Sequence, residues 1–180
     1  MEEQNFGFIR EPMQVKLLIL FVLRRLPAAI GEDALAELVL IDGGINYFDY
    51  RQCLMELIDT RQIAVTEEGY TVTPNGDRNA AALEEDIPFS VRQKAALALA
   101  PTVAEMRRME MLTAAHSSGE NGVTVHLAIS DGVGSIFDLH ILAADEKQAG
   151  IIERNFKKNA ESFYHRFIEE LSADKGAVKS

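Results

Sequence analysis

The stretch GGINYFDYRQCLMELIDTRQI, residues 43–63, predicts a capped helix around which the first half of the chain is organised. Asn46 and Asp49 stand three residues apart, so each side chain can bond to the backbone amide of the other, as in a capping box. We therefore expect the helix to begin near Tyr47. Its apolar face carries Tyr50, Leu54, Leu57 and Ile58. Its other side carries Asp49, Arg51, Gln52, Met55, Glu56 and Asp59.

Two helices are expected before this one and a hairpin after it. Residues 12–26 place apolar side chains at helical spacing, which predicts a central, mostly buried helix that ends at Pro27. Residues 32–41 predict a shorter helix. Residues 63–66 and 70–73 alternate in polarity on either side of Glu67, Glu68 and Gly69, so they predict a tight hairpin. The chain then returns to helix at PNGDRNAAALEED.

The segments YFDYRQCLMELIDTRQI and GYTVTPNG resemble the pattern of bacterial winged-helix regulators of the PadR and MarR kind, over roughly residues 12–85. Nearly the whole chain also resembles an uncharacterised family of small bacterial winged-helix proteins. In this pattern Thr73-x-x-Gly76 places a turn and a helix start directly after the wing. Arg61 and Gln62 stand where the regulators usually have Gly-Leu, so a left-handed helix end would fall on an arginine.

The second half of the chain predicts a sheet covered by one long helix. A helix is expected after Ile87-Pro88, running towards Pro101, followed by alternating strands at residues 108–116, 123–129 and 137–141. The residues DGVGS form a turn, and residues 145–171 have apolar side chains at helical spacing. The predicted fold class is α+β: a winged helix-turn-helix domain over residues 1–87, then a dimerisation or sensor domain over residues 88–180 with a three-stranded antiparallel sheet and a long C-terminal helix.

The composition predicts a cytoplasmic protein. The longest apolar run, residues 17–23, is seven residues long, whereas about 20 are needed to cross a bilayer. The start MEEQNFGF lacks the basic lead of a secretory signal. The single cysteine, Cys53, has no partner for a disulfide and is expected to pack inside its helix. The net charge of −10 lies almost entirely before residue 88, where seven Lys and Arg face sixteen Asp and Glu.

The resemblance implies a DNA-binding transcriptional regulator whose helix at residues 47–59 enters the major groove. Arg51 can bond to guanine and Gln52 to adenine, each through two hydrogen bonds. The candidate DNA-contacting residues are Tyr47, Arg51, Gln52, Met55, Arg24, Arg25 and Arg78; Arg10 and Lys16 could add phosphate contacts. The acidic Glu67 and Glu68 at the wing tip would be repelled by phosphate. The alternative hypothesis is therefore a winged-helix protein-interaction module that does not bind DNA.

The second half offers candidate sites of other kinds. Pairing Leu127 with Leu139 would place His126 opposite His140, with Glu110 and Asp138 on the same face. Two imidazoles and two carboxylates could hold a metal ion; the sequence favours polar residues on the open face of a half-covered sheet, and we assign no metal or cofactor. The aromatic residues of the last helix predict a core or a homodimer interface, with a small-molecule effector pocket as the alternative. No nucleophile or phosphate-loop motif is present, so we do not expect an enzyme.

Overall fold

The computed structural model describes residues 9, 11–41, 43–119 and 122–173, which excludes the candidate Arg10. The chain divides into two compact units, Met1–Arg107 and Arg108–Ser180, which are described separately below. The sequence placed the boundary after residue 87. The contacts instead assign the following helix, up to Arg107, to the first unit, because its buried residues Val91, Ala95 and Leu99 belong to that unit's core.

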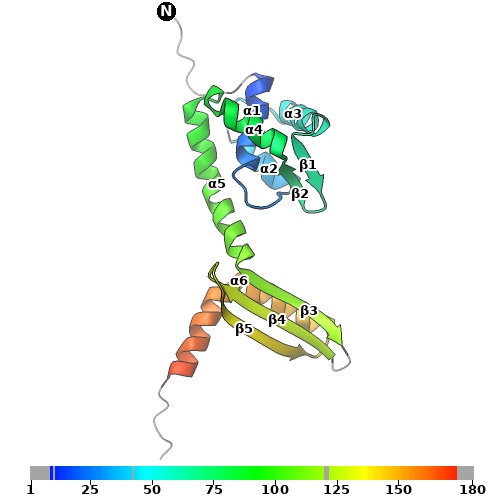
Figure 1. The fold of residues 1–180 in the computed structure, drawn as a ribbon, viewed down its shortest axis with the longest axis vertical. Helices are drawn as coiled ribbons and strands as arrows, with labels where there is room; N and C mark the ends of the chain where they lie inside the picture. Colours follow the sequence, from blue (N-terminus) through cyan, green and yellow to red (C-terminus); the bar gives the residue numbers. More distant parts are fainter. Residues whose placement is uncertain (1–8, 10, 42, 120–121, 174–180) are drawn as a thin grey trace, which may run out of the picture. The chain divides into compact units, whose positions relative to one another are not determined.

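The first unit is built around one buried helix (Figure 1). Its elements are α1 (Pro12–Leu23), α2 (Glu32–Val39), α3 (Tyr47–Asp59), β1 (Ile63–Thr66), β2 (Gly69–Val72), α4 (Pro74–Leu83), the short 3-10 helix η1 (Glu84–Asp86) and α5 (Phe89–Glu110). α1 is buried from Leu17 to Leu23 and contacts α2, α3 and α4, as its continuous apolar sequence predicts. Cys53 is buried, as expected.

Both ends of α3 are specified by local contacts. The Asn46 side chain accepts a hydrogen bond from the Asp49 amide at 2.9 Å and caps the helix, which confirms the predicted start. The reciprocal contact differs from a capping box, since Asp49 accepts from the Asn46 side-chain amide at 2.6 Å. At the other end Arg61 has φ of 56°, so the left-handed position falls on an arginine as predicted. The amides of Arg61 and Gln62 close the helix by bonding to the carbonyls of Ile58 and Leu57.

The hairpin β1–β2 is extended by a backbone bridge from the loop between α1 and α2. Ile30 exchanges two hydrogen bonds with Tyr70, of 3.1 and 2.8 Å. Gly69, which lies beside this bridge, has φ of 127° and faces the Ile30 carbonyl so closely that an added Cβ would lie 2.2 Å from its oxygen. Only glycine satisfies both conditions. The loop before α2 is thereby attached to the hairpin.

A second close approach joins the end of α3 to the start of α4. The Thr73 hydroxyl lies 2.9 Å from the carbonyl oxygen of Arg61 and 3.1 Å from that of Gln62. The Thr73 hydroxyl also caps α4 by accepting from the Gly76 amide at 3.2 Å. A Cβ on Gly76 would lie 2.2 Å from the Gln62 carbonyl oxygen. The Thr73-x-x-Gly76 element therefore positions α4 directly against the backbone that follows α3.

The second unit is a three-stranded antiparallel sheet with one helix on one face (Figure 1). Its elements are β3 (Leu112–Gly119), β4 (Gly122–Ser130), β5 (Ser135–Ala143) and α6 (Glu146–Ser172), in the strand order β3-β4-β5. The predicted register is confirmed: Leu127 pairs with Leu139 and His126 pairs with His140. α6 is capped by Asp145 and kinked at Asn159, where the backbone leaves the helical region. The α+β class, the sheet and the C-terminal helix are as expected.

The helix before the sheet is longer than the sequence predicted. α5 continues through Pro101 to Glu110, so the strand expected over residues 108–116 begins only at Leu112. Val103 and Met106 pack against the core of the first unit. This packing offsets the hydrogen bond that Pro101 cannot donate. Glu110 consequently lies on a helix, and its predicted place beside His126 and His140 was wrong. In the described ranges, no helix combines the length and apolar character needed to cross a membrane.

The contact at Gly76 provides a test of the first unit's packing. We expect Gly76→Ala to lower the free energy of unfolding by about 1–3 kcal/mol, because the new methyl group meets backbone that cannot rotate away. Gly43→Ala is the control, since nothing lies within 4 Å of a Cβ at Gly43. Urea unfolding monitored by circular dichroism measures both variants. Equal stability of the two would contradict the close approach.

Candidate functional site

The outer face of α3 carries exposed apolar side chains. Tyr47 is 50% exposed, Phe48 84% and Met55 49%. We call these three residues, with the exposed Asp49, Gln52 and Asp59, the α3 outer face. The sequence singled out Tyr47, Gln52 and Met55 but missed Phe48. Its position was readable, because residues 48, 52, 55 and 59 follow helical spacing along one side.

Arg51, the predicted guanine-binding residue, is engaged by a carboxylate of α2. Its guanidinium is ion-paired with Glu32, which also accepts a hydrogen bond from the Tyr70 hydroxyl at 3.2 Å. The bond from Arg51 lowers the pKa of Glu32, with smaller contributions from Tyr70 and Tyr47. The same contact raises the pKa of Arg51. This network joins α2, α3 and β2, and it holds the arginine against the protein.

Lys16 of α1 is also ion-paired, in this case with a glutamate of α3. Lys16 contacts Glu56 at 2.5 Å, and Gln52 donates to the other oxygen of Glu56 at 3.0 Å. These two bonds lower the pKa of Glu56. A phosphate group would have to compete with Glu32 for Arg51 and with Glu56 for Lys16.

Arg24 and Arg25 do not join Arg51. Arg24 contacts Asp77 at 2.9 Å and Glu84 at 3.1 Å, and the bond to Asp77 raises its pKa. Arg25 contacts Glu84 at 2.6 Å and lies 3.5 Å over the ring of Phe21. Both arginines therefore connect α1 to α4 and η1. Arg78 is exposed on α4 and has no carboxylate partner within the residues that are described.

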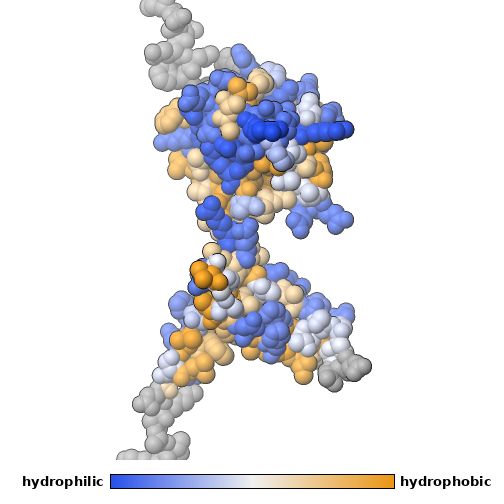
Figure 2. Space-filling model, in the orientation of Figure 1, coloured by the Kyte–Doolittle hydropathy of each residue, from blue (hydrophilic) through white to orange (hydrophobic). Residues whose placement is uncertain are grey.

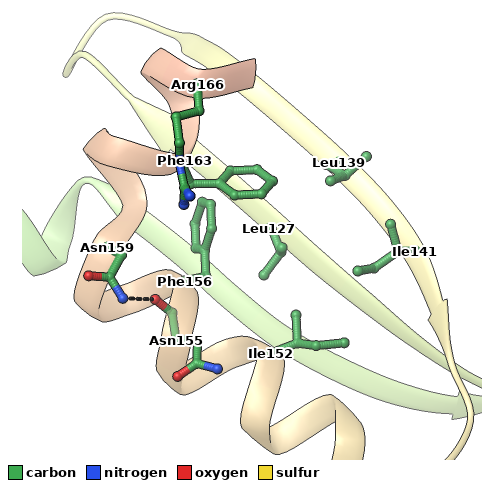
Figure 3. Close-up of a pocket in the computed structure, with 9 residues that line it drawn as sticks. All are labelled: Leu127, Leu139, Ile141, Ile152, Asn155, Phe156, Asn159, Phe163 and Arg166. Carbon is green, nitrogen blue, oxygen red and sulfur yellow. Dashed lines mark hydrogen bonds between the residues drawn. The ribbon is translucent and has the colours of Figure 1, made fainter. Parts of the chain in front are cut away.

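The second unit contains a pocket between the sheet and α6 (Figure 3). Its volume is about 330 Å³. Leu127, Leu139 and Ile141 line it from the strands, and Ile152, Asn155, Phe156, Asn159, Phe163 and Arg166 line it from α6. The lining is mostly apolar with a few polar groups, as in sites that bind small organic molecules. The kink at Asn159, whose side chain bonds to the Asn155 carbonyl at 3.1 Å, separates the two parts of α6 that line the pocket.

The Glu32 network predicts a dependence of stability on pH. Because the pKa of Glu32 is lowered below its ordinary value of 4.5 in the folded state, its contribution is present above about pH 4.5 and is lost as the pH falls further. Glu32→Gln should therefore unfold more easily than the wild type at pH 7, and this difference should shrink at pH 3.5. Urea midpoints at the two pH values measure it.

Glu37→Gln, an exposed change on the same helix, is the control for that measurement. It should leave the pH dependence of the midpoint as in the wild type. If the urea midpoint of Glu32→Gln depended on pH as that of the wild type does, the ion pair of Glu32 with Arg51 would not contribute to stability.

Comparison with known proteins places the chain in a family without assigning an activity. No curated protein matches the chain, and no solved structure matches it. One family model matches residues 15–171, and its description is a domain of unknown function, DUF4364. Since the match covers most of the chain, this protein belongs to the DUF4364 family.

Proposed function

We propose that the first unit is a winged helix that binds a partner protein through the α3 outer face. A single observation carries this proposal. α3 exposes large apolar side chains, whereas the cations Arg51 on α3 and Lys16 beside it are already paired with glutamates. The second unit, in this proposal, provides dimerisation and the site of a small-molecule effector. The protein would then be a regulator that acts through protein contact.

The order and contacts of the elements support the winged-helix assignment. Three helices precede a two-stranded hairpin. Ile30, in the loop between α1 and α2, forms an antiparallel bridge to the β2 strand of that hairpin. The Thr73–Gly76 contact places α4 directly after the wing, as the resemblance to the PadR and MarR regulators implies.

The side chains of α3 favour a protein over DNA as the partner. Tyr47, Phe48 and Met55 present large apolar surface, and aromatic residues with methionine are enriched at the centres of protein interfaces. Asp49 and Asp59 add negative charge to the same face. We therefore expect a partner with an apolar centre surrounded by Lys or Arg.

A DNA-binding transcriptional regulator remains the second candidate. It is favoured by the exposure of Gln52 on the capped helix α3 and by the exposed Arg78, which has no carboxylate partner among the described residues. Against it stand the pairs Arg51–Glu32 and Lys16–Glu56 and the exposed Glu67 and Glu68 in the turn between β1 and β2. Protein–DNA affinity depends mainly on cations that neutralise phosphate.

Replacing Phe48 tests the protein-binding proposal. Phe48→Ser should abolish the capture of a partner from extracts of cells that make this protein, because the apolar centre of the face is lost. Phe89→Ser is the matched control, since Phe89 is 71% exposed on α5 in the same unit. Affinity purification with mass spectrometry measures both variants. Capture of the same partner by the wild type and by Phe48→Ser would refute the proposal. It would also be refuted if no partner were captured by both the wild type and Phe89→Ser.

DNA titration separates the two candidates. We expect the wild type to show no measurable binding to random or genomic duplexes at 50 and 150 mM salt, in fluorescence anisotropy. The double variant Glu67→Lys/Glu68→Lys should gain salt-sensitive binding only if the wing lies along the duplex. Sequence-selective binding by the wild type, weakened by Gln52→Ala, would instead establish the regulator that reads DNA.

The last turns of α6 support dimerisation. Phe167 is 38% exposed, Ile168 42% and Leu171 70%, and Figure 2 shows apolar surface on the C-terminal part of α6. A second copy of this helix would cover the apolar surface with an identical one. The pocket beside the kink would hold the effector.

Leu171→Glu should convert a dimer of the full chain into monomer, because two carboxylates would face each other in a symmetric interface. Light scattering at tens of micromolar protein measures the molar mass. Glu161→Gln, an exposed change on the same helix, should leave the dimer intact. A wild-type protein that is monomeric at this concentration would exclude the proposed interface.

A further inference from the structure

The face of the sheet opposite α6 gathers two histidines and one aspartate. His126 on β4 and His140 on β5 are directly paired, and their rings stack with centroids 4.2 Å apart and planes 3° from parallel. Asp138 precedes His140 by two residues, so its side chain lies on the same face as His140. It pairs with Ala128, which makes it the diagonal neighbour of His126.

The donor atoms of these side chains are close enough to share one ion. The Asp138 Oδ1 atom lies 3.1 Å from His126 Nε2 and 3.3 Å from His140 Nε2. One ligand atom from each of the three residues lies within 4.8 Å of the others. A tetrahedral zinc ion with bonds of about 2.0–2.1 Å separates adjacent donors by about 3.3–3.4 Å. The two distances to Asp138 already approach this separation.

The three strands offer these side chains no other charged partner. β3, β4 and β5 contain no lysine or arginine, and Asp138 is their only carboxylate. Asp138 therefore has no cation on the sheet that would neutralise it. The remaining histidine of the strands, His116, bonds instead to Glu153 of α6 at 2.7 Å, on the covered face. The cross-strand partners of His126 on β3 and of Asp138 on β4 are small, since they are Ala115 and Ala128.

We propose that His126, Asp138 and His140 form a binding site for a divalent transition-metal ion of the zinc class. Two imidazole nitrogens with one carboxylate oxygen suit Zn²⁺, Ni²⁺ or Cu²⁺ and not Mg²⁺ or Ca²⁺, which prefer oxygen alone. The fourth position of a tetrahedral ion would face solvent, because His140 is exposed. A bound ion would also cross-link β4 to β5.

The competing description is a hydrogen-bonded trio without an ion. In that case Asp138 accepts a hydrogen bond from the Nε2 atom of His126 at 3.1 Å, and the Nε2 atom of His140 lies within ion-pair distance of it at 3.3 Å. The two descriptions differ in a measurable way. The trio alone predicts no metal stoichiometry, whereas the metal site predicts one ion per chain that depends on all three side chains.

Zinc titration of the full-length chain, free of any histidine tag and stripped with chelator, tests the site. Isothermal titration calorimetry should give one Zn²⁺ per chain. His140→Ala and Asp138→Asn should each weaken binding by more than about tenfold, since loss of a ligand exceeds the effect of losing an outer contact. His116→Ala should bind as the wild type does. Circular dichroism establishes that each variant is folded.

Cobalt provides a second, spectroscopic readout that reports the ligands of the bound ion. Co²⁺ added to the wild type should produce visible absorption of a four- or five-coordinate site with nitrogen ligands, and His140→Ala should lack it. Zinc should also raise the melting temperature of the wild type and of His116→Ala but not of His140→Ala. No zinc binding by the wild type, or equal binding by wild type and His140→Ala, would overturn the proposal.

Discussion

The carbonyl oxygen of Gln62 is where the end of α3, the hairpin and the start of α4 meet. It accepts a hydrogen bond from the Thr73 amide at 3.0 Å, and the Thr73 hydroxyl lies 3.1 Å from it. Gly76 approaches the same oxygen so closely that no other residue fits without displacement. Arg61, just before this point, has the left-handed conformation, which ends α3 and turns the chain into the hairpin. The outer face of α3 therefore has a defined orientation relative to β1 and β2.

The charges of the first unit are organised by pairing across elements. Arg51 meets a glutamate of α2, Lys16 meets a glutamate of α3, and Arg24 and Arg25 meet acidic residues of α4 and η1. These pairs use cations that a DNA-binding surface would present to phosphate. Apart from Gln52, the side chains that stay exposed on the outer face of α3 are aromatic, apolar or acidic. The fold of the first unit is thus compatible with recognition of a protein partner, because fold and function are separable.

The second unit has two faces with different chemistry. The covered face contains the core, in which Phe137 packs against Phe156 and Phe163 of α6, and it also contains the pocket beside the Asn159 kink. The open face carries the only carboxylate of the strands, which contacts the Nε2 atoms of two imidazoles that stack on each other. A sheet with strict alternation can support both, because adjacent residues point in opposite directions. An effector and a metal ion would then bind on opposite sides of the same three strands.

The sequence by itself determined the features that depend on nearby residues. Asn46 and Asp49 predicted the start of α3, and the alternation of β4 and β5 predicted the pairing of His126 with His140. Each of these rests on contacts within a few residues or on a period of two. The left-handed end at Arg61 followed from the resemblance to the PadR and MarR regulators. The tertiary structure alone decided which cations are paired, since Arg51 and Glu32 lie 19 residues apart and Arg24 and Asp77 lie 53 apart. It also decided that α5 continues past Pro101, because packing of Val103 and Met106 outweighs the local signal to stop. Local patterns specify backbone conformation, whereas side-chain partners distant in sequence are specified only when the chain is folded.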